Sequence, residues 1–311
     1  MQNSSTEKNN LLHKVQEFGW IYDKYCGFLN REERKMYSGL GLSKSSLDKI
    51  NKSVDHYFMD KTSETPAMRI GTAFHTLILE PEKFGKDYAC GPNADRRTTA
   101  GKNAWKESEE SNPNKILLSV NDWDMIHFMQ RSVLKHKLSS HLLNLDLGKS
   151  EETMMWNDPE LGTLMKGRSD FRNFSEKVVI DLKSTMDASS DKLERDIWSS
   201  DLRYHVQAAI YTDGARSILD DDSWEFLFVF VEKKPPYAVQ VVHLPKKSIE
   251  IGRIQYRENV LYLLQWLENA SNALENGEVL SSSFDEKIIE LNPPAWLVQK
   301  VKKNNRLRDN L

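Results

Sequence analysis

The chain has 311 residues, of which 29% are charged and 39% hydrophobic, and its formal net charge at pH 7 is −3. This length and composition are typical of a soluble protein with one large domain, or one domain with arms, that buries a sizeable core. The net charge argues against a protein that coats nucleic acid nonspecifically, so any DNA contact must come from a local basic patch.

Cysteine usage and hydropathy indicate the cellular compartment in which the protein is expected to work. Cys26 and Cys90 lie far apart and form no CxxC pair, which argues against a zinc ribbon, an iron–sulfur cluster and a disulfide scaffold. The longest fully apolar run, Phe226 to Val231, is far too short to span a membrane. The N-terminus has no apolar segment of the signal-peptide type. We therefore expect a protein of a reducing cytoplasm that has no membrane partner.

The first half of the chain predicts mainly helices. Residues 1–40 are polar and mixed, with one helix expected near residues 11–25. Leu47, Ile50, Val54 and Phe58 recur at helical spacing and predict a helix over residues 41–58, with Ser43 or Ser45 as its N-cap. Two further helices are expected over residues 65–81, ended by Pro81, and over residues 120–136. The polar residues 91–114, rich in Gly, Asn, Lys and Arg, predict a long loop or mobile arm.

The second half changes to strands rich in Val, Ile, Phe and Trp. They are expected over residues 153–158, 163–171, 177–184, 224–232 and 237–244. A helix over residues 201–218 connects the third and fourth strands, and this crossover indicates a parallel or mixed sheet. A long helix over residues 246–276 and a basic tail follow. The chain is therefore predicted to be an α/β protein with a helical N-terminal layer.

The third strand carries charged residues where a hairpin is expected to pack its core. Side chains alternate along a strand, so Asp181 and Lys183 share one face, while Val178, Ile180 and Leu182 share the other. A hairpin with the preceding strand would bring Asp170 beside Asp181. Paired carboxylates repel each other unless a cation lies between them, and Mg²⁺ prefers such oxygens. Two carboxylates and a lysine on one face are what metal-assisted phosphodiester hydrolysis needs.

A lone D-x-K is more often a solvated salt bridge, but here the pattern is longer. "GRSD", a turn and "VVIDLKS" resemble the core motif of the PD-(D/E)xK nuclease superfamily. Gln207 and Tyr211 lie four residues apart on the next helix, as in the Q-x-x-x-Y motif of the RecB-like branch, although a core Tyr with an incidental Gln is the plain interpretation. His75 lies on an upstream helix where that branch carries an extra metal ligand, although a lone His among apolar residues is commonly a core residue.

Five motifs in order resemble the C-terminal nuclease domain of exodeoxyribonuclease VIII (RecE) and related phage and prophage exonucleases: "KSSLDKI", "GTAFHTLILEP", "GRSDF", "IDLKST" and "YHVQAAIYTDG". The resemblance covers about residues 40–270. It implies a restriction-endonuclease-like core, a central mixed β-sheet flanked by helices. We expect an unmatched N-terminal arm over residues 1–40, the exonuclease domain over residues 41–280 and a basic tail over residues 281–311.

The resemblance also implies a role for each matching residue. Asp170 and Asp181 would bind Mg²⁺, or Mn²⁺, together with His75 and the main-chain carbonyl of Leu182. Lys183 would position the attacking water, and Gln207 and Tyr211 would line the site near the scissile phosphate. Such enzymes resect linear double-stranded DNA from an end, act as rings around it, and leave a 3′ overhang for a RecT-like annealing protein.

Two basic segments are weaker DNA-binding candidates. Ser43, Lys44 and Ser45 open a helix, and helix N-termini bind phosphate, so they are candidates for holding a 5′ phosphate, with a plain N-cap as the competing interpretation. The polar segment offers phosphate contacts from Arg96, Arg97, Lys102 and Lys106, with Trp105 as a stacking residue, or else it is a solvated loop. Glu152 is a further acidic candidate for the site.

Three competing functions remain open on this sequence. A structure-specific or single-strand nuclease would use the same core. A catalytically silent DNA-binding subunit would keep the fold, although the intact Asp170, Asp181 and Lys183 speak against it. A non-nuclease α/β protein would require all five motif matches to be accidental. The chain has no Walker A motif, because "AGKN" lacks its spacing, so no use of ATP is expected.

Overall fold

The computed structural model describes residues 27–29, 40–60 and 63–277, with single positions between 288 and 301. The chain divides into two compact units, Met1–Val279 and Leu280–Leu311, and the description below concerns the first. The helix expected near residues 11–25 lies outside the described residues, as does most of the basic tail. In the described ranges, every helix is too short or too polar to cross a membrane.

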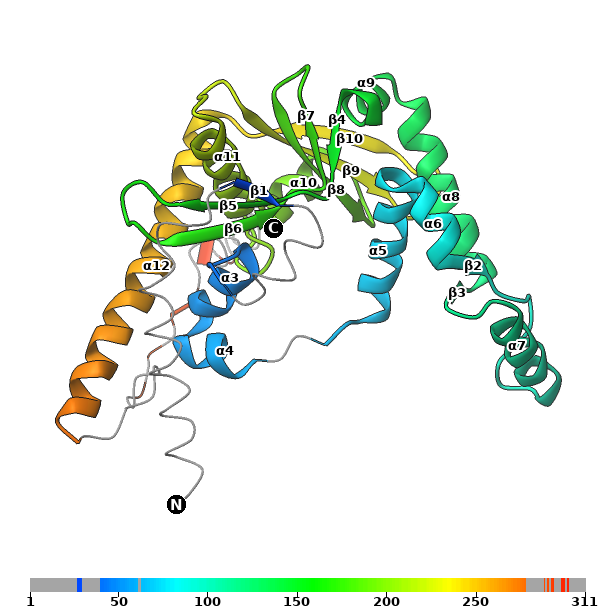
Figure 1. The fold of residues 1–311 in the computed structure, drawn as a ribbon, viewed down its shortest axis with the longest axis horizontal. Helices are drawn as coiled ribbons and strands as arrows, with labels where there is room; N and C mark the ends of the chain where they lie inside the picture. Colours follow the sequence, from blue (N-terminus) through cyan, green and yellow to red (C-terminus); the bar gives the residue numbers. More distant parts are fainter. Residues whose placement is uncertain are drawn as a thin grey trace, which may run out of the picture. The chain divides into compact units, whose positions relative to one another are not determined.

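Helices dominate both ends of the described chain, and strands dominate its middle (Figure 1). The helices are α3 (Lys44–Lys52), α4 (Val54–Met59), α5 (Pro66–Leu79), α6 (Pro81–Asp87), α7 (Thr99–Ser111), α8 (Val120–Lys135), α9 (Lys137–Leu142), the 3₁₀ turn η1 (Leu145–Leu147), α10 (Ser190–Ile197), α11 (Tyr204–Leu219) and α12 (Lys246–Glu275). The strands are β1 (Gly27–Leu29), β2 (Tyr88–Cys90), β3 (Ile116–Leu118), β4 (Gly148–Ser150), β5 (Thr153–Asn157), β6 (Leu164–Arg168), β7 (Phe171–Asn173), β8 (Val178–Thr185), β9 (Glu225–Glu232) and β10 (Val239–His243).

The central sheet is mixed, as predicted. Its strand order is β10-β9-β8-β7-β4. β8 and β9 pair in parallel, because α11 crosses between them, and the other pairs are antiparallel. Helices flank the sheet, which confirms the predicted α/β class (Figure 1). Two smaller sheets accompany it, an antiparallel one in the order β1-β5-β6 and a parallel pair of β2 and β3.

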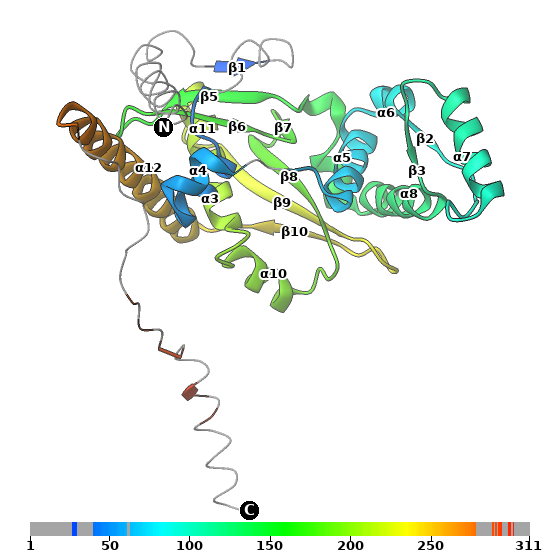
Figure 2. The same ribbon diagram turned by 90° about the horizontal axis from the view of Figure 1, so that it is seen from below.

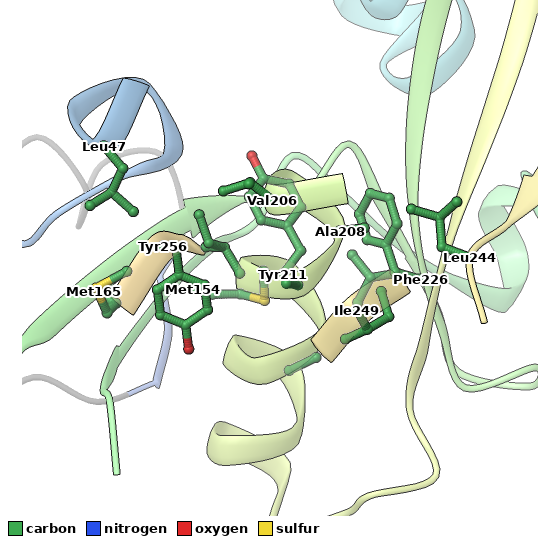
Figure 3. Packing of buried hydrophobic residues seen from close by; sticks show 14 of the residues in the cluster. Leu47, Met154, Met165, Val206, Ala208, Tyr211, Phe226, Leu244, Ile249 and Tyr256 are labelled. Carbon is green, nitrogen blue, oxygen red and sulfur yellow. The ribbon is translucent and has the colours of Figure 1, made fainter. Parts of the chain in front are cut away.

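The two faces of β8 enter two different hydrophobic clusters. Val178, Ile180 and Leu182 pack with residues of α5 and α8 on one side. Val179 packs on the other side with β9, α11 and α12, in the cluster that Figure 3 shows around Tyr211 and Phe226. The alternation read from the sequence is therefore present. Asp181 and Lys183 belong to the α11 side by that same alternation.

Two predictions of local structure were wrong. The helix expected over residues 41–58 is two helices, because Ser53 is extended, with φ of −175°, and its side chain caps α4. By contrast, α5 ends at Leu79, just before Pro81, as predicted, and Pro81 then occupies the first turn of α6, where its missing N–H is tolerated. Residues 91–114 are no simple loop, because Thr98 caps α7 by accepting a hydrogen bond from the Gly101 N–H.

Candidate functional site

The β7–β8 hairpin brings Asp170 close to the β8 main chain. Phe171 pairs with Ile180, and Asp170 directly precedes Phe171 in the chain. The Leu182 N–H donates a hydrogen bond to Asp170 Oδ2 at 2.7 Å. This bond fixes the Asp170 carboxylate beside the segment that carries Asp181. The predicted juxtaposition of the two acids is therefore what the hairpin produces.

Asp181 is a buried carboxylate with little compensation. Gln207 Nε2 donates to its Oδ1. Lys183 Nζ lies 2.6 Å from its Oδ2, yet that oxygen accepts no hydrogen bond of acceptable geometry. The pKa of Asp181 is raised to about 6, because burial and the nearby Asp170 raise it more than Lys183 lowers it. A buried carboxylate in this state favours a neighbouring cation.

His75 of α5 faces the same acids. Its Nδ1 lies 3.4 Å from Asp170 Oδ2. Burial lowers the pKa of His75, but Asp170 and Asp181 together raise it above its usual value. Burial raises the pKa of Asp170, but His75, Lys183 and the Leu182 N–H bring it below its usual value. The upstream helix thus brings a histidine nitrogen to these acids, and its role as a metal ligand stays a prediction.

Glu151 is a fourth member of the site that the sequence did not reveal. Its N–H donates to the Asp170 carbonyl at 2.9 Å, and one ligand atom each of His75, Glu151 and Asp170 lie within 4.8 Å of one another. Glu152, which was the predicted candidate, instead receives the Arg172 guanidinium at 2.7 Å. Glu151 has a left-handed φ of 58° between β4 and β5, and this conformation interrupts strand alternation. The sequence shows two adjacent acids, Glu151 and Glu152, but it does not show which of them faces Asp170.

This set of ligands fits a divalent ion. Carboxylate oxygens with one imidazole suit Mg²⁺ or Mn²⁺, and thiolates are not needed. Asp170 and Asp181 are buried carboxylates that interact with each other, and such a pair favours a cation between them. Asp181 itself lies outside the group of three, so the structure favours Glu151 beside Asp170 and His75 more directly. The Leu182 carbonyl as a ligand stays a prediction.

A cavity of about 660 Å³ opens beside these acids. Its lining brings together segments that are far apart in the sequence: Ser43, Lys44, Ser45, Asp48, Thr153, Met155, Lys166, Gly167, Arg168, Lys183, Asp201, Leu202, Tyr204, Gln207 and Tyr211. The start of α3 therefore shares a cavity with three of the predicted catalytic residues. Ser43 is the N-cap of α3, and its hydroxyl accepts from the Ser46 N–H at 3.3 Å. Burial lowers the pKa of Lys44, although Asp48, 2.6 Å away, raises it.

Tyr211 forms a wall of the cavity because of a glycine. Gln207 and Tyr211 are both buried residues of α11 and line the same cavity, as their spacing predicts. A Cβ on Gly167 would lie only 2.8 Å from the Tyr211 ring. The glycine of the "GRSD" motif therefore lets the ring pack against β6. Burial raises the pKa of Tyr211, so its hydroxyl stays protonated.

The polar segment does not join the cavity. Figures 1 and 2 both show α7 well separated from α3 and α11. Trp105 was predicted to stack on bases, but it is 7% exposed and its indole N–H donates to the Ala94 carbonyl at 2.9 Å. The Arg96 guanidinium covers its ring at 3.6 Å, and Arg97 pairs with Asp95. Trp105 is thus a packing residue of this segment, and Lys102 is exposed on its surface.

Comparisons with known proteins identify the family of the chain. The profile of the family described as "PDDEXK-like domain of unknown function (DUF3799)" matches residues 43–281, which is more than half of the chain, and the chain belongs to this family. No curated protein is significantly similar in sequence.

Among solved structures, the chain is similar to a protein from Eubacterium rectale described as a "putative exonuclease". The TM-score is 0.51 at 10% identity, and the match covers 87% of this chain and 97% of that one. At this identity the match supports the fold alone. A structure described as SSO0001 aligns with a TM-score of 0.26 at 16% identity, over 70% of this chain and 85% of that one, which is too weak to support an argument.

Proposed function

We propose that this member of the PDDEXK-like family is a divalent-metal-dependent, ATP-independent exodeoxyribonuclease that resects linear double-stranded DNA. The observation that carries the proposal is the arrangement of Asp170, Asp181 and Lys183 on one hairpin, beside a cavity that Lys183 lines. A purely structural salt bridge between Asp181 and Lys183 would not need two further carboxylates and a histidine near it. The family and the fold of the Eubacterium rectale protein agree with a nuclease.

Each residue of the site has its own role in the proposed reaction. Glu151, Asp170 and His75 would hold Mg²⁺ or Mn²⁺, with Asp181 beside them. A bound divalent ion supplies a water of lowered pKa and a Lewis acid for the phosphoryl oxygen. Lys183 remains protonated, since Asp181 and Asp170 raise its pKa against the effect of burial. Its ammonium is placed to orient the attacking water and to stabilise charge developing on the phosphate.

Gln207 and Tyr211 act around this centre. Gln207 holds the Asp181 carboxylate through its side-chain amide, which fixes one oxygen and leaves the other toward Lys183. Tyr211 offers a protonated hydroxyl in the cavity wall. A cavity of this volume has the size of a small-ligand pocket, so it accepts a nucleotide or two of one strand.

The finer parts of the proposal rest on the resemblance to RecE-like exonucleases. They are 5′ to 3′ resection that leaves 3′ overhangs, a ring-shaped homo-oligomer, a RecT-like annealing partner, and a role in phage or prophage recombination in the cytoplasm of a bacterial host. Ser43, Lys44 and Ser45 would receive the 5′ phosphate, and their place on the cavity wall favours this over a plain cap. Lys44→Ala should then remove the preference for 5′-phosphorylated ends.

The proposal is tested with linear duplex, closed circular duplex and single-stranded DNA, in Mg²⁺ without ATP, and with Asp181→Ala as the matched variant. Loss of linear duplex alone, abolished in the variant, is the expected result. Cleavage of circles would replace the exonuclease by an endonuclease on the same core. Cleavage of single strands only would favour the single-strand nuclease. No cleavage at all would favour a silent DNA-binding subunit. Ca²⁺ should support binding with little turnover, because its coordination is looser.

A further inference from the structure

Two cations lie on the boundary between the cavity and the carboxylates. Lys183 lines the cavity and lies 2.6 Å from Asp181 Oδ2. Arg168 lines the same cavity, and its Nη2 forms an ion pair with Glu151 Oε2. The proposed function gives Lys183 a role in the chemistry. Arg168 pairs with Glu151 as Lys183 pairs with Asp181, but the proposed chemistry does not yet use Arg168.

The main chain of β6 holds Arg168 where its side chain reaches both Glu151 and the cavity. Arg168 ends β6, opposite Thr153 of β5, and its backbone is close enough to Tyr211 to lower the pKa of that hydroxyl. The side chains of Arg168 and Glu151 are 32% and 15% exposed, so the pair is only partly buried. A change of side-chain torsions alone is then enough to move the guanidinium from Glu151 into the cavity.

The charge of the site shows when such a move is favourable. The three carboxylates of Glu151, Asp170 and Asp181 attract the cations Lys183 and Arg168, and they raise the pKa of His75. A bound divalent ion adds two positive charges, so the site then carries an excess of positive charge. A phosphodiester in the cavity would offset this excess. Arg168 is therefore needed by Glu151 before the ion binds, and it is available to a phosphate afterwards.

We propose that Arg168 exchanges partners, pairing with Glu151 in the metal-free protein and with a phosphate of the DNA strand once a divalent ion binds Glu151. This inference rests on the proposed function and deepens it. A guanidinium is suited to the exchange, because its planar fork binds carboxylate and phosphate with the same geometry. Metal and DNA then bind cooperatively, and by linkage each tightens the binding of the other.

The test compares Arg168→Gln with Lys149→Gln in the full chain. Lys149 provides the matched control, because it is 64% exposed and contacts Glu152 rather than Glu151. Mn²⁺ affinity is measured by calorimetry without DNA, and the affinity for a short fluorescent duplex is measured by anisotropy in Ca²⁺. For Arg168→Gln we expect Mn²⁺ to bind about threefold to tenfold tighter, since Glu151 loses its competing cation. We expect DNA to bind about tenfold weaker, since a charge-assisted phosphate contact is lost. Lys149→Gln should change both affinities by less than about twofold.

These opposite directions distinguish the exchange from a structural role. Weaker Mn²⁺ binding in Arg168→Gln would mean that Arg168 positions Glu151 for the ion, and the exchange would be wrong. Unchanged DNA affinity would exclude the phosphate contact.

If Arg168→Gln lacks a cooperative melting transition, Arg168→Lys carries the test. This variant keeps a positive charge beside Glu151 but loses the planar fork of the guanidinium. Arg168→Lys should bind Mn²⁺ like the wild type and DNA several-fold more weakly; equal DNA affinity would refute the proposal. A wild type that neither cleaves nor binds DNA would refute the proposed function, while the Mn²⁺ comparison would still test the pairing with Glu151.

Discussion

The cavity wall and the α7 segment, residues 88–118, both place charged side chains beside aromatic rings. They differ in how far these charges are buried and paired. In the α7 segment, Arg97 pairs with Asp95, and Arg96 stacks on Trp105 at the protein surface. Behind the cavity wall, Asp181 contacts the lining residues Lys183 and Gln207, is 3% exposed, and has one oxygen without a hydrogen bond of acceptable geometry. Both segments looked suited to bind DNA in the sequence. The difference teaches that burial of several interacting charges, more than the presence of basic and aromatic residues, distinguishes the candidate site from the α7 segment.

The largest expected effect separates chemistry from stability. Asp181→Asn keeps the shape of the side chain but removes a carboxylate from the metal site, so cleavage should fall by at least about a thousandfold. The free energy of unfolding should change by less than about 1 kcal/mol, because Asp170 still offsets the Lys183 charge and the change relieves repulsion between two buried carboxylates. Cleavage of linear duplex and chemical denaturation measure the two quantities. Strong destabilisation would mean that Asp181 is foremost a structural ion-pair partner.

A change in the α7 segment should instead reduce stability and leave cleavage almost unchanged. A Cβ on Gly91 would lie 2.3 Å from the Trp105 ring, so the ring fills a tight space. Trp105→Ala should therefore reduce stability by about 3–5 kcal/mol, measured by denaturation. Cleavage by the folded fraction should stay within about threefold of the wild type, because Trp105 does not line the cavity.

The matched variant in the same segment is Arg97→Gln, since Arg97 is 90% exposed and pairs with Asp95 at the protein surface. It should leave the denaturation curve unchanged, because exposed ion pairs contribute little to stability. If Trp105→Ala instead weakened DNA binding and left the melting temperature unchanged, the stacking role predicted from the sequence would be restored.

An intermediate effect is expected at the glycine of the "GRSD" motif. In Gly167→Ala, the new methyl group would press on the Tyr211 ring, so the ring has to shift within the cavity wall. We expect a loss of about 1–3 kcal/mol in stability and about a tenfold lower kcat. Gly71→Ala is the control, because nothing lies within 4 Å of a Cβ there and α5 should gain helix propensity. An unchanged kcat in Gly167→Ala would show that the position of Tyr211 is unimportant.

Much of this site could be read from the sequence, because strand alternation is a strong physical constraint. It assigned Asp181 and Lys183 to one face of β8 and Leu182 to the other, and the two hydrophobic clusters agree. Glu151 could not be found this way, since its left-handed φ of 58° depends on the tertiary hydrogen bond from its N–H to Asp170.

The α7 helix was missed for a related reason. Its sequence is polar, and Trp105 gives it a single large apolar anchor, so no helical hydrophobic period is visible. The cavity was equally hidden, because its lining joins α3 to α11 across more than 150 residues of sequence. Local patterns therefore predicted the hairpin, while the contacts between distant segments decided which charges matter.

The smallest expected effect concerns the start of α3, where capping and phosphate binding compete as explanations. Ser43 caps α3 and lines the cavity, whereas Ser53 caps α4 with the same chemistry, accepting from the His56 N–H at 3.1 Å, and does not line it. Ser43→Ala and Ser53→Ala should each reduce stability by about 1 kcal/mol. Only Ser43→Ala should also reduce the rate ratio between 5′-phosphorylated and 5′-hydroxyl duplex ends, by about twofold to fivefold, since one hydrogen bond to phosphate is lost. If both variants leave this ratio unchanged, Ser43 is a cap alone and the phosphate must be bound elsewhere on the cavity wall. Competition kinetics with the two kinds of end in one reaction would resolve so small a difference, because both substrates then meet the same enzyme concentration.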